Sequence, residues 1–345
     1  MTEMLSRWKE ETSRKELCRG DLVEVRSPGE ILATLDAQGE MAGLPFMPEM
    51  AAHCGRRFRV DRRADRVCDT VHYSGSRRLC DAVLLDDLRC DGSGHDGCQA
   101  ECRFFWKEEW LRRARADAPP PPAFPQGDLA ALIERCAKHV RVPGPVNGSE
   151  SVRYRCQATE LPKCTQHIEL WDPMGYVREY ASGNVSLGHF LTVTSRAVVQ
   201  EPLRKLGLIS EVHVAGTAKK GETFEQLDLK VGEWVRVKSR EEIVKTLTPE
   251  GRNKGLWFDR EMLPYCGGTY RVRQKVVRFI DDHEGKMIVL KNEAVTLDSV
   301  VCSGDLSLRR WFCSRAIYPY WRECWLERTE QPAALAAGGG PGAVP

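Results

Sequence analysis

Residues 20–60 read "GDLVEVRSPGEILATLDAQGEMAGLPFMPEMAAHCGRRFRV", and residues 232–272 read "GEWVRVKSREEIVKTLTPEGRNKGLWFDREMLPYCGGTYRV". Aligned without gaps, the two stretches are identical at 18 of 41 positions by direct count. The shared positions include alternating valines, several glycines and an apolar run that ends in Glu-Met shortly before Cys-Gly. A match of this length indicates an internal duplication.

The duplication extends well beyond these stretches. After three extra residues in the second copy the match resumes, and each copy spans about 95 residues, from Gly20 to Arg113 and from Gly232 to Arg328. A unit of that length is a domain and not a solenoid repeat. The later matched pairs are Cys90/Cys302, Cys98/Cys313, Trp106/Trp321 and Trp110/Trp325.

Each copy reads as short strands with few helices. The alternation in "DLVEVRS" predicts a strand, and Ser27 with Glu30 predicts a capping box at the start of a short helix, repeated by Ser239 and Glu242. The aromatic stretches "RFFWKEEWLRR" and "YPYWRECWLER" predict a closing helix. The fold class is therefore mainly β with short helices (α+β), with tandem duplicated small β-barrel (SH3-like) units plus a middle region.

The regions outside the copies differ in composition. A proline-rich segment, "APPPPAFP", separates the first copy from a helical pattern, and the alanine- and glycine-rich end resembles disordered chain. We predict an N-terminal helical arm (1–19), a first repeat with the cysteine cluster (20–114), a linker and helix (115–149), a middle region (150–228), a second repeat (229–330) and a disordered tail (331–345).

Composition narrows the class of protein. A net charge of +2 gives no global basic field, which argues against a dedicated nucleic-acid binder. No apolar run has the length of a membrane span, and the charged N-terminus is unlike a secretory signal, so we expect a cytoplasmic protein. The 14 cysteines are then metal ligands, reactive thiols or buried apolar side chains, because reducing compartments disfavour disulfides.

The cysteine spacing favours a metal. Cys98 and Cys102 would lie one turn apart on the closing helix, and zinc prefers four tetrahedral sulfur or nitrogen ligands. Cys68 or Cys54 would complete the set with Cys90, and His95 is an alternative. The second copy offers one ligand fewer. Either His283 or a water fills the fourth position there, or the second copy binds no metal. The predicted ligands are Cys90, Cys98, Cys102, Cys68, Cys54, Cys302, Cys313 and Cys266.

Other candidates have a structural and a functional interpretation. A glutamate beside a zinc-bound water is a hydrolytic arrangement, but glutamates are more often solvated or capping. The tryptophans either pack in the core or line a binding groove. The arginine-rich strands either face water or contact phosphate. The stretch 186–208 either covers the barrels or docks on a membrane surface. The shared glutamates are Glu49/Glu261 and Glu108/Glu323.

Three stretches carry a resemblance: "GLPFMPEM…CGRRFRV", "LRCDGS…CQAECRFFWKEEWL" and "FCSRAIYPYWRECWLER". Over nearly its whole length the chain resembles an uncharacterised bacterial family with two cysteine-containing repeats, whose members often lie near glycosyltransferase or other biosynthetic genes. The resemblance implies an accessory role in such a pathway and assigns no catalytic residue.

We therefore expect a non-catalytic accessory or interaction protein of a bacterial biosynthetic pathway, with cysteine-ligated structural zinc in at least the first repeat. Its partners would be proteins of that pathway. The alternatives are a zinc-dependent biosynthetic enzyme with an incomplete thiolate site and a nucleic-acid-binding barrel protein. Small barrels bury little core, which is the physical reason to expect a stabilising metal.

Overall fold

The computed structural model describes residues 16–119, 121–144, 152–169, 172–208, 214–219, 221–307 and 309–331. Most of the predicted N-terminal arm and nearly all of the predicted tail therefore lie outside the described residues. The chain divides into two compact units, and each combines segments that are far apart in the sequence. The first contains Met1–Ile209, Arg278–Val289 and Ser303–Ile317, and the second contains Ser210–Val277, Leu290–Cys302 and Tyr318–Pro345.

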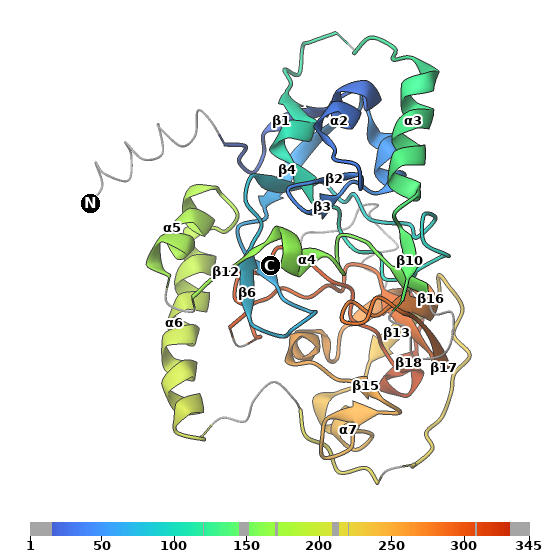
Figure 1. Cartoon of the computed structure of the whole chain (residues 1–345). Coiled ribbons are helices and arrows are strands. Elements are labelled where there is room, and N and C mark those ends of the chain that lie inside the picture. Colours follow the sequence, from blue (N-terminus) through green and yellow to red (C-terminus); the bar gives the residue numbers. More distant parts are fainter. Residues whose placement is uncertain are drawn as a thin grey trace. The chain divides into compact units, whose positions relative to one another are not determined.

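The fold is mixed α+β, with mostly short strands in several small antiparallel sheets and few helices (Figure 1), as the sequence predicted at this coarse level. The main sheet of the first unit has the order β8-β7-β4-β1-β9. Its strands are β1 (Leu22–Val25), β4 (Arg57–Arg63), β7 (Ala82–Leu85), β8 (Trp106–Lys107) and β9 (Leu111–Arg113).

Smaller elements complete the first unit. The remaining strands are β2 (Glu40–Met41), β3 (Leu44–Pro45), β5 (Val67–Cys68), β6 (Ser76–Arg78), β10 (Arg141–Pro143), β11 (Val152–Tyr154) and β12 (Gln166–His167). The helices are α2 (Pro28–Thr34), α3 (Gln126–Ala137), α4 (Leu161–Cys164), α5 (Pro173–Ala181) and α6 (Leu187–Lys205), with 3-10 turns η1 (Pro48–His53) and η2 (Glu108–Trp110).

The main sheet of the second unit repeats the order of four strands of the first, β7-β4-β1-β9. The order there is β17-β16-β13-β18, and β13 pairs with β18 in the register of β1 with β9: Val237 lies opposite Leu326 as Val25 lies opposite Leu111. The elements are β13 (Trp234–Val237), α7 (Arg240–Val244), β14 (Arg252–Asn253), β15 (Leu256–Trp257), η3 (Arg260–Tyr265), β16 (Thr269–Ile280), β17 (Met287–Leu297), η4 (Glu323–Trp325) and β18 (Leu326–Arg328). Parts of β16 and β17 belong to the first unit.

Both predicted capping boxes are confirmed. The Ser27 hydroxyl accepts a hydrogen bond from the Glu30 backbone N–H, and the Glu30 carboxylate accepts one from the Ser27 backbone N–H. Ser239 and Glu242 make the same reciprocal pair at the start of α7. Each box satisfies two backbone donors that the first helical turn leaves unpaired, so it fixes where the short helix begins.

The predicted closing helix is wrong in both copies. Residues 106–113 form β8, the single turn η2 and β9, and residues 323–328 form η4 and β18. These segments are extended and not helical because β9 pairs with the second edge of β1 and β18 pairs with the second edge of β13. Their aromatic residues also favour strands. Cys98 and Cys102 consequently do not lie one helical turn apart.

The tryptophans of the two copies form equivalent cores. Phe46 packs edge-on against Trp106 and Trp110, with ring centroids 6.1 and 5.1 Å apart. In the second unit Phe258 packs against Trp321 and Trp325 at 6.1 and 5.2 Å. All four indoles are fully buried, which supports their interpretation as core residues and not as a binding groove.

Each copy ties one buried indole to a threonine. Trp110 Nε1 donates to Thr34 Oγ1 at 3.1 Å, and Trp325 Nε1 donates to Thr246 Oγ1 at 2.9 Å. We expect Thr34→Val or Thr246→Val to lower the free energy of unfolding of its own unit by about 1–3 kcal/mol, since an indole donor is left buried and unpaired. Urea titration measures this, and Thr192→Val on the exposed face of α6 should change stability by less than about 0.5 kcal/mol.

Candidate metal centre

The loop that follows β7 folds back on itself. The Cys90 N–H donates to the carbonyl of Cys102 at 2.8 Å, and the Gly97 N–H donates to the carbonyl of Gly92 at 3.0 Å. Gly92 has φ +73°, and a β-carbon there would lie 2.1 Å from the Cys98 carbonyl oxygen. Only glycine fits this turn, which returns the chain toward Cys90.

Three side chains of different kinds meet at this loop. Cys90 Sγ lies 3.7 Å from His95 Nε2 and 3.8 Å from a carboxylate oxygen of Glu49, which sits on η1. The same Glu49 oxygen lies 3.0 Å from His95 Nδ1 and accepts the Gly94 N–H at 3.0 Å. One ligand atom from each of Glu49, Cys90 and His95 lies within 4.8 Å of the others, so this group could hold a metal ion.

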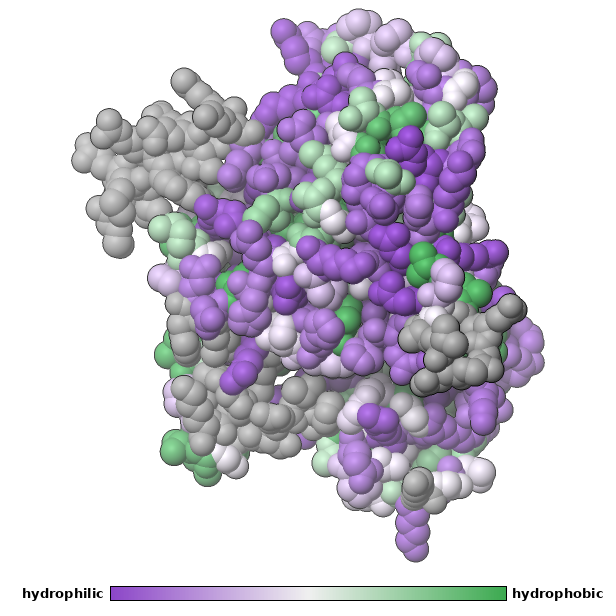
Figure 2. All heavy atoms as spheres, viewed as in Figure 1, coloured by the Kyte–Doolittle hydropathy of each residue, from purple (hydrophilic) through white to green (hydrophobic). Residues whose placement is uncertain are grey.

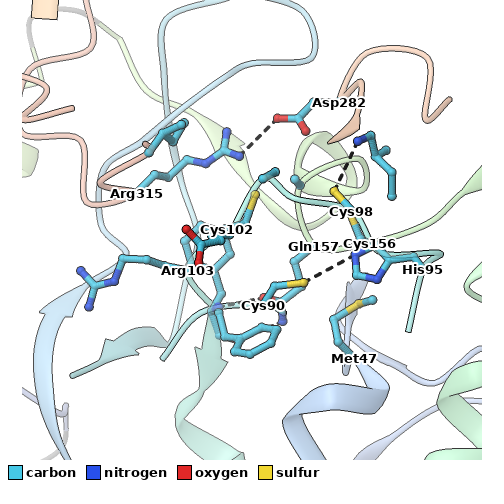
Figure 3. A pocket seen from close by; sticks show the side chains of 17 residues that line it. Met47, Cys90, His95, Cys98, Cys102, Arg103, Cys156, Gln157, Asp282 and Arg315 are labelled. Carbon is cyan, nitrogen blue, oxygen red and sulfur yellow. Dashed lines mark hydrogen bonds and ion pairs between the residues drawn. The ribbon is translucent and has the colours of Figure 1, made fainter. Parts of the chain in front are cut away.

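More thiols line the space beside this group. A cavity of about 30 Å³ is bounded by Cys90, His95, Cys98, Cys102 and Cys156. Figure 3 shows the Cys156 sulfur beside the imidazole of His95, with Cys98 close to it. A space of this size holds a water molecule or an ion, but no organic substrate.

Burial dominates the electrostatics of the group. Burial raises the pKa of the Cys90 thiol to about 11, only partly opposed by the hydrogen bond from His95. Burial alone would raise the pKa of Glu49, but the hydrogen bond and charge of His95 lower it below its usual value. The second carboxylate oxygen of Glu49 is buried and has no hydrogen-bond partner among the described residues. A buried acceptor without a donor is costly, and a cation would satisfy it.

The loop cysteines predicted as ligands are brought together, and His95, the predicted alternative ligand, joins them. Cys90, Cys98 and Cys102 all line the cavity. Cys54 does not line it: Cys54 is buried in the core, where burial raises its thiol pKa to about 12. Cys68 lies elsewhere in the first unit, where its backbone N–H donates to Cys313 Sγ at 3.2 Å.

The remaining predicted ligands belong to the second copy. Cys266 and Cys302 are partly exposed and lie in the second unit. His283, the predicted substitute ligand, lies in the first unit, and its Nδ1 is 2.7 Å from the Val71 carbonyl oxygen. None of these three residues lines the cavity at Cys90.

Sequence reasoning did not single out Cys156, which also lines the cavity. It lies between β11 and α4 in the middle region, which has no counterpart in either copy. Comparing the two copies therefore could not single it out, and its neighbouring sequence has no metal-binding spacing. It reaches the cavity because the Cys156–Thr159 turn is anchored by a hydrogen bond of 2.9 Å from the Cys156 N–H to the Thr159 hydroxyl.

The shared pair Glu108 and Glu323 has a structural role. The Glu108 carboxylate accepts the backbone N–H of Leu17 and contacts Arg63 at 2.6 Å. Glu323 accepts the N–H of Leu229, the residue that aligns with Leu17 in the duplication. Each glutamate therefore fixes the chain just before the first strand of its copy.

The arginines of β4 are largely engaged with acidic groups and backbone carbonyls. Arg57 pairs with Glu24 at 3.2 Å, and the buried Arg63 pairs with Asp65 at 3.1 Å. Arg59 donates to the carbonyl of Gly20. Arginines that are paired in this way offer less positive charge to the phosphate backbone of a nucleic acid.

No known protein family, characterised protein or solved structure matches this chain. Among the residues that the structure describes, no helix is long and apolar enough to cross a bilayer.

Proposed function

We propose that the protein is a non-catalytic accessory or interaction protein whose first unit is stabilised by a zinc ion. The observation that supports this most is the buried convergence of Glu49, Cys90 and His95 beside the Cys156 thiol. In the proposal Glu49, Cys90 and His95 hold the metal, Cys156 of the same cavity is the fourth ligand although its thiol is not part of the converging group, and the other loop cysteines pack around the metal.

The donor set fits zinc. Thiolate with imidazole and carboxylate suits a borderline-soft ion, and magnesium or calcium would prefer oxygen ligands alone. Zinc–sulfur and zinc–nitrogen bonds of about 2.3 and 2.0 Å at a tetrahedral angle separate the two donors by about 3.5 Å. Cys90 Sγ and His95 Nε2 are 3.7 Å apart.

Burial supports a structural metal over a catalytic one. Glu49 and His95 side chains are 4% and 3% exposed, and Cys90 and Cys156 are also buried. Structural zinc sites are closed, whereas a catalytic zinc keeps a position open to substrate. The cavity of about 30 Å³ has room for a water molecule or an ion but not for an organic substrate. This favours the accessory protein over the zinc-dependent enzyme.

An exposed apolar stripe on α6 supports an interaction role. Leu187, Leu191 and Val198 follow helical spacing, fall on one face, and are each more than half exposed. The opposite face packs on Trp311 and Phe312 through Val193 and Ala197. In Figure 2 the green atoms at the lower left lie beyond this stripe, where α6 ends in Figure 1 and the exposed Leu206 and Leu208 follow it. A protein partner in a biosynthetic pathway, as the resemblance implies, would cover the stripe.

The duplicated origin of the two copies is part of the proposal. The identical register of β1–β9 and β13–β18, the two capping boxes and the paired Trp–Thr bonds support descent from one SH3-like module. The metal would then stabilise only the first copy, because His95 belongs to that copy.

Metal analysis tests the proposal. The full chain purified from zinc-supplemented cells is expected to contain about one zinc per molecule, resistant to brief exposure to a weak chelator. Cys90→Ser, His95→Ala and Cys156→Ser should each lose it. Cys302→Ser, the counterpart of Cys90 in the second copy, should retain it.

Two results would contradict the proposal. One is protein free of stoichiometric zinc when produced in zinc-replete cells. The other is zinc that survives replacement of Cys90 but is lost with Cys302.

A further inference from the structure

The two copies exchange equivalent hydrogen bonds inside the first unit. Cys98 Sγ accepts the backbone N–H of Ile280 at 3.3 Å, and Cys313 Sγ accepts that of Cys68 at 3.2 Å. Cys98 aligns with Cys313, and Cys68 aligns with Ile280. Each loop cysteine is therefore bound to the strand of the other copy.

This reciprocity extends to the neighbouring residues. The Gln99 N–H donates to the carbonyl of Arg278, and the Ser314 N–H donates to the carbonyl of Arg66. These four residues also align in pairs. Because the same backbone pattern occurs twice, the hydrogen bond to the loop cysteine is a feature of how both loops fold. The two contacts differ only in the strand residue, which is Ile280 opposite Cys98 and Cys68 opposite Cys313.

Only one of the two places therefore holds two thiols. Cys313 Sγ lies 3.2 Å from the Cys68 backbone nitrogen, so the two side chains are neighbours, and Cys68 and Cys313 are 5% and 3% exposed. They are 245 residues apart in the sequence. Neither lines the cavity of the proposed zinc site.

A buried guanidinium completes this pair. Arg315 is 5% exposed, and its Nη1 lies 4.0 Å from Cys68 Sγ and 3.2 Å from the Cys68 carbonyl oxygen. The same Nη1 donates to Thr70 at 2.6 Å, and the second Nη lies 3.3 Å from Asp282. The residue aligned with Arg315 in the first copy is Ala100, so Cys98 has no arginine at the equivalent position.

We propose that Cys68 and Cys313 form a reversible disulfide, with Cys68 as the reactive thiolate and Cys313 as the thiol that resolves it. Arg315 holds the negative charge on Cys68, and the oxidant is a hydroperoxide. The proposed disulfide does not require bound zinc, although Arg315 also lines the cavity of the proposed zinc site.

The chemistry balances in two steps. The Cys68 thiolate attacks one oxygen of hydrogen peroxide, an S–O bond forms, the O–O bond breaks, and hydroxide leaves and takes up a proton. The Cys313 thiol then displaces hydroxide from the sulfenic acid, and its own proton completes a second water. Sulfur loses two electrons, peroxide gains two, and an added dithiol reverses the reaction by exchange.

The electrostatics support Cys68 as the attacking group. The hydrogen bond from Cys313 lowers the pKa of Cys68 despite burial, and the charges of Arg315 and Arg310 lower it further. By contrast, burial raises the pKa of Cys98 and of Cys102. The thiolate is the nucleophile, so Cys68 should react before these neighbours.

The test treats the reduced, zinc-loaded full chain with a small excess of hydrogen peroxide, followed by non-reducing digestion and mass spectrometry. The expected product is a peptide linked through Cys68 and Cys313 that disappears with dithiothreitol. Cys313→Ala should abolish the link and leave a sulfenic acid at Cys68 that dimedone captures. Cys80→Ser, at a partly exposed thiol, should leave the link unchanged.

The wild-type digest alone can overturn the proposal if a variant fails to fold. Cys68 and Cys313 recovered as free thiols when Cys80 is already oxidised would overturn it. So would Cys68 oxidised to sulfinic acid without any linked peptide.

Discussion

Cys90→Ser is expected to unfold the first unit at a temperature at which the second unit stays folded. The serine hydroxyl is a poor zinc ligand, so the variant loses the stabilisation that bound metal gives. For free zinc a thousandfold above the dissociation constant this is about 4 kcal/mol. For a unit of this size we expect the melting temperature to fall by about 8–16 °C. Scanning calorimetry would show one shifted and one unshifted transition.

The matched control is Cys80→Ser, a substitution of a partly exposed thiol in the same unit that does not line the cavity. Its melting curve should follow that of the wild type. Excess chelator should shift the wild-type curve to that of Cys90→Ser and leave the variant unchanged. Unaltered melting of Cys90→Ser would remove Cys90 from the set of metal ligands.

Glu179→Gln is expected to stabilise the first unit above pH 8 and to have little effect at pH 4.5. Glu179 lies on α5 and is 1% exposed. Burial raises the pKa of its carboxyl to about 8, although a hydrogen bond of 2.8 Å from Asn184 favours the charged form. Its other carboxylate oxygen has no hydrogen-bond partner among the described residues.

The sign follows from proton linkage. Between the ordinary pKa of about 4.5 and the folded pKa of about 8, the folded chain binds a proton that the unfolded chain releases. The contribution of Glu179 to stability is therefore fully present below pH 4.5 and is lost as pH rises to 8. Each pKa unit corresponds to about 1.4 kcal/mol, so glutamine, which is always neutral, should gain at most about 4–5 kcal/mol above pH 8.

Urea titrations of both proteins from pH 5 to pH 9 measure this difference. The wild type should lose stability relative to Glu179→Gln as pH rises. Parallel pH profiles for the two proteins would show that Glu179 is charged in the folded state. Asp172→Asn, on the partly exposed cap of the same helix, serves as the control.

Local signals were predictable because a few neighbouring residues determine them. Ser27 and Glu30 lie three residues apart, so their reciprocal bonds need no tertiary structure. The valine alternation of "DLVEV" likewise marks β1. The closing segment was mispredicted because the sequence around Trp110 and Leu111 has a helical pattern. In the structure Leu111 pairs with Val25 of β1, about 85 residues upstream. Tertiary pairing overrides local propensity there.

The candidate metal centre was half predictable for a similar reason. Cys90, His95 and Cys98 share one loop, and their spacing was visible. Glu49 was noticed only as a carboxylate shared by both copies, and Cys156 comes from a region that the duplication does not cover. Neither could be placed beside His95 before the chain was folded.

The division of the chain into interleaved segments has a consequence for its synthesis. The first unit needs residues up to Ile317, which leave the ribosome 108 residues after Ile209 (317 minus 209). At roughly 5–20 residues per second, the nascent N-terminal part waits about 5–20 s for its last pieces. During that interval its apolar surface is incompletely covered, so the growing chain is prone to aggregation until Ile317 has emerged.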